Sequence, residues 1–593
     1  MGAFSRLLGD AFYKINRRYY WYRLWPPFNF LNLIAIRINL RRRNLHDTNV
    51  KTPVAPPANQ CGVDCARYRT FDGSHNDPEK PWMGMTATRF GRNFPLDQVM
   101  PDTERMLTPS PREISRRLMK RDTFKPATSL NLLAAAWLQF QVHDWFSHDN
   151  AKDLKSISLQ EGDDWTPNPM QVTSTLWDTL PGPADEKRPP AALCHQSHWW
   201  DASQLYGSDR RRQDALRTKQ GGKLKLTADG RLPLDENGID LTGNNNNWWL
   251  GLSVMHTLFV HEHNAVCDEL AKHYPAWKDD QLFHTARLVI AALLAKIHTI
   301  EWTPSLLNTK LLRFGMRANW FGILGERFRR NIGRISRGDI LSGITGSETD
   351  HHGVPYAMTE EFVAVYRMHP LIPDQFDIKD ARTGEPVASY DLPEVAGSNT
   401  KAAVDAVGME NALYHLGTAH PGALVLRNYP NMLRKLTTEP VKKFQVDLAA
   451  LDIFRDRERG VPRYNAFRRL IDMPRIERFE DLTADQELAK EIEAIYGDID
   501  LVDTLVGCLA EKPPPGFAFS DTAFRIFILM ASRRLKSDRF FTIDFRPEIY
   551  SEVGFDWVMD TSMTDVLRRH FPEIAAAIEP GTSPFFPWTR PVA

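Results

Sequence analysis

Apolar residues recur with the spacing of α-helices along most of the chain, and no internal repeat is visible. Residues 129–138 are rich in leucine and alanine, which predicts a helix leading into Gln139. The segment before His369 predicts another helix, which Pro370 ends because proline does not continue one. A further apolar run, residues 524–530, fits either ordinary core or the wall of a tunnel. The pattern therefore predicts a mainly α-helical protein.

The first fifty residues have a different character, because basic and aromatic side chains are mixed in them. The basic residues are Arg17, Arg18, Arg23, Arg37, Arg41, Arg42 and Arg43, and the aromatic ones are Tyr19, Tyr20, Trp21, Tyr22, Trp25, Phe28 and Phe30. The longest apolar stretch, residues 28–36, is far below the ~20 residues needed to span a bilayer, and it lacks the order of a signal peptide. Two interpretations stay open: a segment at the membrane interface, and helices that pack on the rest of the protein.

Composition limits the possible partners and compartments. The chain has 74 basic and 74 acidic residues, so no nucleic-acid partner is indicated. Its five cysteines include one close pair, Cys61 and Cys65, and fit a reducing compartment or buried thiols. We expect a monomer that is cytoplasmic or peripheral on a membrane surface.

Gln139 and His143 are one helical turn apart and therefore share a helix face. On the open side of a haem, a histidine at this position would take a proton from one peroxide oxygen and return it to the other. The neighbouring glutamine amide would hold peroxide or water. For this pair alone, a hydrogen-bonded core histidine is the alternative interpretation.

Tyr366 precedes His369 by three positions, which places both on one face of the predicted helix. If His369 binds a haem iron, Tyr366 is a radical-forming group beside it. The alternative is a helix-terminal histidine with a tyrosine in the core. The upstream motif around His143 favours the haem interpretation.

Oxygen-bearing side chains recur at every second or fourth position in residues 197–203, at Ser197, Asp201 and Ser203. In an extended or looped backbone they face one side, and main-chain carbonyls such as that of Trp199 join them. Such a set suits Ca²⁺, which accepts six to eight oxygen ligands. Asp144, next to the first histidine, would supply the remaining carboxylate. A surface turn rich in serine and aspartate is the alternative.

Three motifs in this order carry a resemblance to a known superfamily: Gln-x-x-x-His-Asp, Ser-x-Trp-x-Asp-x-Ser-x-x-Tyr-Gly and Tyr-x-x-His-Pro-Leu-x-Pro-Asp. With matching stretches at residues 296–303, 455–465 and 530–534, they resemble the animal haem peroxidase–cyclooxygenase superfamily, and within it most of all the fatty-acid α-dioxygenases. The resemblance implies a mainly α-helical catalytic domain, residues 56–593, behind an N-terminal extension, residues 1–55. It also implies haem b buried between the two histidine-bearing helices.

Departures from the wider superfamily narrow the choice of branch. Val142 stands where relatives with covalently attached haem have an aspartate, which implies non-covalent haem. The few cysteines do not fit the growth-factor-like module of cyclooxygenases. The 593 residues leave no room for the second haem-thiolate domain of fungal diol synthases. The α-dioxygenase branch remains.

The resemblance implies a reaction and a substrate site. The Tyr366 radical would abstract a hydrogen from C2 of a long-chain fatty acid, and O₂ would add to give a 2-hydroperoxy fatty acid. The resemblance places His298, Thr303 and Arg534 around the substrate carboxylate, and hydrogen-bonding and cationic groups suit that role.

Further residues are assigned to the haem itself. Arg455 and Arg459, one helical turn apart, would pair with the haem propionates, whereas plain surface charge is the competing interpretation. Asn465 resembles the residue that accepts a hydrogen bond from the imidazole of His369. Two other functions stay open: a haem peroxidase that oxidises small reductants with hydrogen peroxide, and a non-catalytic haem-binding sensor.

Overall fold

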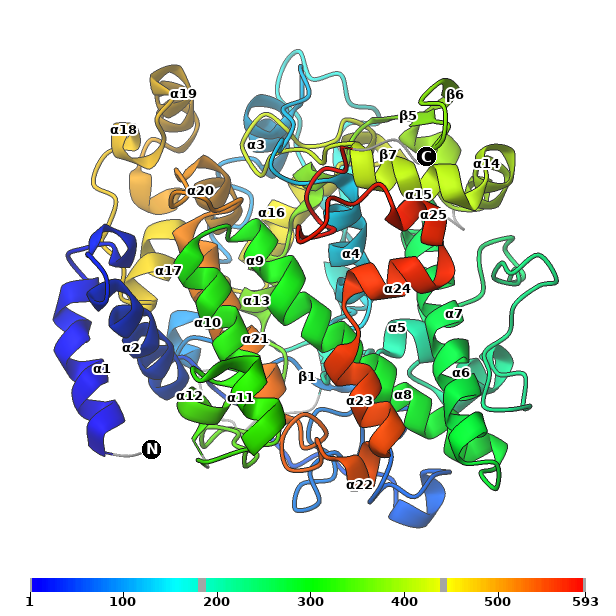
Figure 1. Ribbon diagram of the computed structural model, residues 1–593. Coiled ribbons are helices and arrows are strands. Elements are labelled where there is room, and N and C mark those ends of the chain that lie inside the picture. The colour runs from blue at the N-terminus through cyan, green and yellow to red at the C-terminus, as the bar shows by residue number, and fades with distance from the viewer. Residues whose placement is uncertain (1–2, 180–187, 337, 438–444, 590–593) are drawn as a thin grey trace.

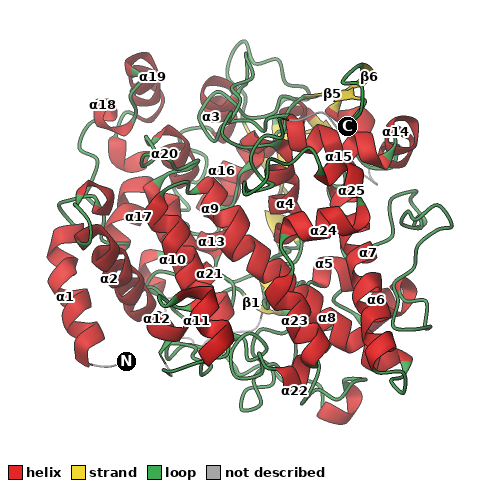
Figure 2. Cartoon of the chain, viewed as in Figure 1, coloured by secondary structure: helices red, strands yellow, loops and turns green. Residues whose placement is uncertain are grey.

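The computed structural model describes residues 3–179, 188–336, 338–437 and 445–589, and most of its regular structure is helical (Figures 1 and 2). Four helices form the centre: α4 (Leu132–Val142), α7 (Leu250–His273), α8 (Asp279–Ile297) and α21 (Asp521–Ser537). Helix α7 packs against both α4 and α8. The prediction of a mainly α-helical protein is confirmed.

Helix α4 follows directly from its sequence. The side chain of Asn131 caps it by accepting a hydrogen bond from the backbone N–H of Ala134 at 3.2 Å. The eleven residues contain no glycine or proline, and nearly all of them are buried. A helix that is apolar all round belongs inside the protein, and α4 lies in the middle of the molecule (Figure 1).

A second apolar segment begins with α8. It continues through a π-helical turn, His298–Trp302, into α9 (Thr303–Leu306). The whole stretch, Asp279–Leu306, has the length and apolar composition of a membrane span, but 94% of its most apolar window is buried inside the protein. It is therefore a core helix, and its π-turn interrupts the helical register between His298 and Thr303.

The N-terminal helix α1 (Ala3–Asn16) packs on α2 (Phe28–Arg43), and both lie at one side of the molecule (Figure 1). Helix α2 packs on α21, and its Arg37 donates a 2.6 Å hydrogen bond to Asn319 of α10 (Lys310–Phe321). Arg41 forms a 3.0 Å ion pair with Asp339 of α12 (Asp339–Ser342). Helix α2 therefore packs on the rest of the protein, as one of the two interpretations of this segment expects.

The remaining helices surround this centre. They are α3 (Pro111–Ile114), α5 (Ser203–Tyr206), α6 (Arg210–Leu216), α11 (Gly325–Ile332), α13 (Glu360–Val365), α14 (Asn399–Val407), α15 (Met409–Thr418), α16 (Leu448–Glu458), α17 (Tyr464–Leu470), α18 (Phe479–Leu482), α19 (Gln486–Tyr496), α20 (Thr504–Ala510), α22 (Pro547–Tyr550), α23 (Glu552–Asp560), α24 (Met563–His570) and α25 (Pro572–Ala575).

The strands form two-stranded antiparallel pairs rather than a larger sheet in the described ranges. These pairs are β1 (Thr88–Arg89) with β4 (Leu193–Cys194), β2 (Asn150–Ile157) with β3 (Met170–Thr175), β5 (Gln375–Lys379) with β6 (Pro386–Asp391), and β7 (Leu436–Thr437) with β8 (Gln445–Val446).

Candidate functional site

His143 is the first residue after α4, and its backbone N–H still bonds to the carbonyl of Gln139 at 3.1 Å. The two residues therefore keep the one-turn relation expected from the sequence. Gln139 accepts a hydrogen bond from Trp249 Nε1 at 2.7 Å, which orients its amide. Burial lowers the pKa of His143 to about 4, so the imidazole is neutral at ordinary pH. Its Nδ1 has no hydrogen-bond partner among the described residues. A neutral, unpaired imidazole is able to accept a proton.

The prediction that Tyr366 and His369 share one helix is wrong. Helix α13 ends at Val365, Tyr366 follows as its C-terminal cap, and His369 opens a separate 3₁₀ turn, His369–Leu371. Because Pro370 has no N–H to bond the carbonyl of Tyr366 four residues before it, and its ring would clash with that carbonyl, the chain leaves the helix one turn earlier than expected.

Tyr366 is nonetheless buried in an aromatic setting. Its ring centroid lies 4.4 Å from that of Phe362, 5.0 Å from that of Trp145 and 5.8 Å from that of Phe527. Burial raises its pKa well above the usual value, although Arg534 acts to lower it. The hydroxyl has no partner within the described structure. An unpartnered buried hydroxyl is costly and calls for an explanation in function.

His369 keeps a third of its side chain exposed (33%), whereas the groups around it are buried. Its Nδ1 lies 3.0 Å from Oδ2 of Asp452, a buried residue of α16 that also accepts a hydrogen bond from Tyr429. A carboxylate at this position orients the ring, which leaves Nε2 as the nitrogen able to bind a metal.

The role predicted for Asn465 is wrong. Its amide donates to the carbonyl of Ile476 and to Asp500, and its oxygen accepts from the backbone N–H of Ile476. The side chain is therefore fully used within its own surroundings, and Asp452 stands beside His369 instead. Asp452 precedes Arg455 by three residues, so a search along the same helix face would have found it.

Arg455 and Arg459 come together around Thr175 of β3. Arg455 is held by Glu458, Thr175 and neighbouring groups of the β2–β3 hairpin. Arg459 is more loosely held, with Nε 3.2 Å from the Thr175 hydroxyl and Nη1 3.8 Å from Glu360. Burial lowers the pKa of Arg459 to about 10, and a further anion beside it would offset that cost. Of the two, Arg459 fits a propionate better.

The five residues predicted to bind calcium meet in one buried cluster. The backbone N–H of Ser203 lies 2.6 Å from Asp144 Oδ1 and 3.2 Å from Asp201 Oδ1, and the Ser197 hydroxyl donates to Asp201 at 2.9 Å. The Trp199 carbonyl accepts a 3.3 Å hydrogen bond from Arg534 Nη2, which also lies 3.7 Å from Asp144 Oδ2.

Electrostatics of this cluster fit a cation. Burial and the neighbouring Asp201 raise the pKa of Asp144 well above its usual value. Asp144 Oδ2 has no hydrogen-bond partner among the described residues, although Arg534 Nη2 lies 3.7 Å away. Two buried carboxylates side by side repel each other, and a divalent cation between them removes that repulsion. The donor set, all oxygen, matches Ca²⁺.

An apolar cavity of about 900 Å³, counted with the space at its mouth, runs between α2, α10 and α21. Phe524, Phe527 and Ile528 from the apolar run at 524–530 line it, whereas Ile526, Leu529 and Met530 are core. One face of α21 in this run therefore lines the cavity, and the other face is ordinary core, so both interpretations of the run hold. From α2, the residues Phe30, Leu33, Ile34 and Arg37 form part of the wall.

His298 and Thr303, two of the three residues predicted to bind the substrate carboxylate, line this cavity. Burial, with help from Arg534, holds the pKa of His298 well below the usual value. Its Nδ1 accepts a 3.2 Å hydrogen bond from Trp137 Nε1, so the neutral ring carries its proton on Nε2, which has no partner in the described chain. The third residue, Arg534, does not line the cavity.

Arg534 lies behind two tryptophans instead. Its guanidinium carbon is 4.6 Å from the ring centroid of Trp145 and 4.9 Å from that of Trp200. Its Nε and Nη1 have no hydrogen-bond partners in the described ranges. Trp145 also contacts the rings of Tyr366 and His298, at 5.0 and 5.4 Å between centroids. Trp145 was not predicted as a site residue, yet it contacts Tyr366, His298 at the cavity, and Arg534 beside the cation cluster.

Known proteins match this chain over most or all of its length. The family model for animal haem peroxidases matches residues 68–581. "Alpha-dioxygenase PIOX" of Oryza sativa subsp. japonica is 39% identical over 613 residues, covering 99% of this chain and 96% of that protein.

Solved structures agree with this similarity. The crystal structure of a tyrosine-to-phenylalanine variant of the Oryza sativa fatty acid alpha-dioxygenase with palmitic acid has a TM-score of 0.92 and 37% identity, covering 100% of this chain and 98% of that one. The fatty acid alpha-dioxygenase of Arabidopsis thaliana also has a TM-score of 0.92, at 36% identity, covering 100% of this chain and 94% of that one.

Proposed function

This chain belongs to the animal haem peroxidase family and is a fatty acid α-dioxygenase, and from that premise we propose that Tyr366 is the group that attacks the substrate. The observation that carries the proposal is the buried Tyr366 hydroxyl, which has no hydrogen-bond partner in the described structure. Its ring stacks on Phe527, which itself lines the cavity. The phenol oxygen is thus free to exchange a hydrogen atom with a molecule at the inner end of that cavity.

The haem implied by the family fits the residues around Tyr366. His369, with Asp452 behind Nδ1, would hold the iron through Nε2, and Arg459 would pair with a propionate. When bound, the haem supplies the oxidising equivalent that converts the tyrosine to its radical. His143, neutral and unpaired at Nδ1 in the described structure, accepts a proton from peroxide and returns it, while the Gln139 amide positions the peroxide.

The cavity determines which carbon reacts. His298 presents the proton on Nε2 to the cavity, and Thr303 adds a hydroxyl, so together they bind one end of a carboxylate. Arg534, behind Trp145 and Trp200, adds positive charge without direct contact. With the carboxylate held there, C2 is the first carbon that reaches Tyr366. The acyl chain then extends between α2 and α10. The Tyr366 radical takes a hydrogen atom from C2, O₂ adds to the resulting carbon radical, and the tyrosine returns a hydrogen atom to the peroxyl radical to give a 2-hydroperoxy fatty acid.

We further propose that Ca²⁺ binds Asp144, Asp201, Ser197, Ser203 and the Trp199 carbonyl. The support is the pair of buried carboxylates and the unpartnered Asp144 Oδ2 in the described part of the chain. Because Asp144 directly follows His143, a cation there would hold the histidine in position. A single chain contains all of these groups, so the proposal needs no second subunit.

Exposed side chains on the helices that form the cavity support peripheral membrane association. Eight exposed apolar side chains, which we call the entry surface, lie on α1–α2, α10–α12 and the loops beside them: Tyr19, Trp25, Phe28, Phe314, Leu324, Ile332, Ile335 and Leu341. Exposed arginines, including Arg17, Arg18 and Arg23, accompany them. Aromatic and basic groups together suit a lipid–water interface, from which a fatty acid would enter.

Vesicle binding tests the entry surface. We expect the parent protein to sediment with anionic lipid vesicles and a Trp25→Ala, Phe28→Ala double variant to stay in the supernatant. Val387→Ala, on β6 and outside the entry surface, is the matched control with an exposed apolar residue removed. Equal sedimentation of the parent and the double variant would rule out this use of the surface.

Oxygen uptake tests the role of Tyr366. We expect the haem-loaded protein to consume O₂ with palmitate, and Tyr366→Phe to lose nearly all uptake while it keeps the parent haem spectrum. Tyr414→Phe, a variant at a buried tyrosine of α15, is the control and should remain active. Sustained oxidation of phenols without fatty-acid-dependent uptake would favour the peroxidase alternative, and equal uptake by Tyr366→Phe would refute the radical assignment.

A further inference from the structure

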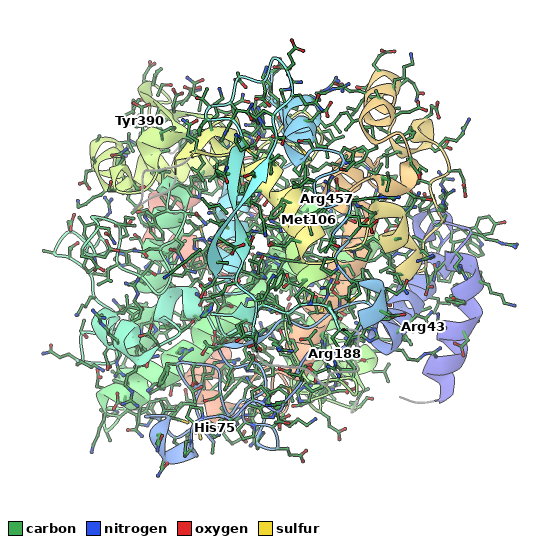
Figure 3. All side chains as sticks on the ribbon, turned by 180° about the vertical axis from the view of Figure 1, so that it is seen from behind. Arg43, His75, Met106, Arg188, Tyr390 and Arg457 are labelled. Atoms are coloured by element: carbon green, nitrogen blue, oxygen red, sulfur yellow. The ribbon has the colours of Figure 1, made fainter. Side chains whose placement is uncertain are left out.

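A second group of metal-binding side chains lies away from the catalytic residues, on the loop of residues 61–75. Cys61, Cys65 and His75 each offer one donor atom, and these atoms all lie within 4.8 Å of one another. Both thiols are free, with Cys61 buried and Cys65 partly exposed. Figure 3 shows His75 at the lower edge of the molecule, on a different side from Arg43 of α2.

We propose that these three residues bind one Zn²⁺ ion, with water as the fourth ligand. Zinc prefers a tetrahedron of thiolate and imidazole, with bonds of about 2.3 Å to sulfur and 2.0–2.1 Å to nitrogen, so that donor atoms are roughly 3.5–3.8 Å apart. The donors of Cys61, Cys65 and His75 need to move by about 1 Å at most to reach this geometry. The partial exposure of Cys65 and His75 leaves access for water.

The ring of His75 makes a hydrogen bond of a kind that is common among metal ligands. Its Nε2 lies 2.7 Å from the carbonyl oxygen of Pro56 and donates a hydrogen bond to it, so Nδ1 carries the free lone pair. Histidine ligands of metals commonly donate their other N–H to a carbonyl in this way. The backbone of His75 is left-handed (φ 59°), a costly conformation for a residue other than glycine, and its N–H bonds to the Pro81 carbonyl at 2.7 Å.

The loop that the zinc would brace supports the calcium cluster. The carbonyl of Gly73 accepts a 2.9 Å hydrogen bond from Trp199 Nε1. A Cβ added at Gly73 would lie 2.7 Å from Cβ of Ser197, so the two loops are in close contact. The Thr70 carbonyl also accepts a 3.0 Å hydrogen bond from Arg287, which pairs with Asp201. A zinc ion at one end of this loop would therefore steady the surroundings of the calcium ligands.

A disulfide between Cys61 and Cys65 is the competing use of the two thiols. It would leave the histidine without a role, whereas zinc uses all three side chains. A disulfide also needs the two sulfurs at about 2.05 Å, and that bond excludes both thiolates as metal ligands. The two outcomes are therefore mutually exclusive in one molecule.

Elemental analysis of the haem-loaded full chain, incubated with Zn²⁺ and dialysed, tests the proposal. We expect about one zinc per chain in the parent, a loss to near zero in Cys61→Ser and in Cys65→Ser, and a large reduction in His75→Ala. Cys508→Ser, at a partly exposed thiol on α20, should keep its zinc. Parent protein without zinc would overturn the proposal.

A measurement on the parent chain covers the case in which a variant fails to fold. In the zinc-loaded protein we expect Cys61 and Cys65 to resist alkylation, and a chelator selective for zinc over calcium should expose both. Mass spectrometry of the same peptides without reduction identifies a disulfide. A linked Cys61–Cys65 pair in the zinc-treated protein, or alkylation unaffected by the chelator, would refute the zinc site.

Discussion

Gly315 allows a direct test of whether the cavity holds the acyl chain. It lies within α10 and lines the cavity, and a Cβ built on it meets no atom within 4 Å. A leucine at this position therefore points into open space without a backbone clash. Because leucine favours helices more than glycine does, we expect Gly315→Leu to stabilise α10 by about 0.7 kcal/mol.

The effect on substrate follows from the volume that the new side chain takes. Leucine adds four carbon atoms, which displace about four methylene groups of a chain lying against α10. Each methylene that is no longer buried costs ~0.8 kcal/mol, or about 3 kcal/mol in total. This corresponds to a loss of roughly 200-fold in kcat/KM for palmitate, because 1.36 kcal/mol is a factor of ten.

Oxygen uptake over a series of saturated fatty acids measures this change. We expect Gly315→Leu to lose palmitate activity while shorter acids retain theirs, and Gly315→Ala, with one added carbon, to show roughly a fourfold loss. Thermal unfolding supplies the control for folding, since both variants should be at least as stable as the parent. A stable Gly315→Leu protein with unchanged palmitate kinetics would mean that the acyl chain does not lie in this cavity.

Two further predictions concern the groups around the histidines. Asp201→Asn keeps the shape of the side chain but removes one of the two buried carboxylates. We therefore expect the calcium content after dialysis to fall from about one per chain to near zero. Asp10→Asn, at an exposed carboxylate, is the control, and an unchanged calcium content in Asp201→Asn would refute the site. Asp452→Asn removes the charge beside His369, and we expect an altered haem spectrum with an activity loss of roughly 10–100-fold. Asn465→Ala should leave the haem spectrum unchanged. The opposite pattern would restore Asn465 as the partner of His369.

Local sequence order predicted the parts of the site that lie within one element. Gln139 and His143 keep their one-turn relation because it depends only on the helix that joins them. The prediction for Tyr366 and His369 failed at the same scale, because the proline after His369 ended the helix one turn early. The choice of Asn465 failed for a different reason. Its amide found partners in Ile476 and Asp500, which no local pattern reveals.

Long-range packing decided how the cavity is built. The sequence left open whether the N-terminal aromatic segment lies on a membrane or packs on the protein, and the structure places α2 in the cavity wall. It also places Arg534 behind Trp145 and Trp200, although the family resemblance implied that Arg534 contacts the substrate carboxylate. Side chains more than two hundred residues apart set these positions.

The amino-acid sequence by itself determined the helical class and brought forward His143, His369, Tyr366 and the residues proposed to bind calcium, because each belongs to a short pattern whose chemistry depends on neighbouring residues. Only the tertiary structure decided that Asp452 stands beside His369, that Trp145 joins Tyr366 to the inner end of the cavity, and that Cys61, Cys65 and His75 converge. Burial and distance are properties of the packed chain, and they give a tyrosine or a cysteine its reactivity.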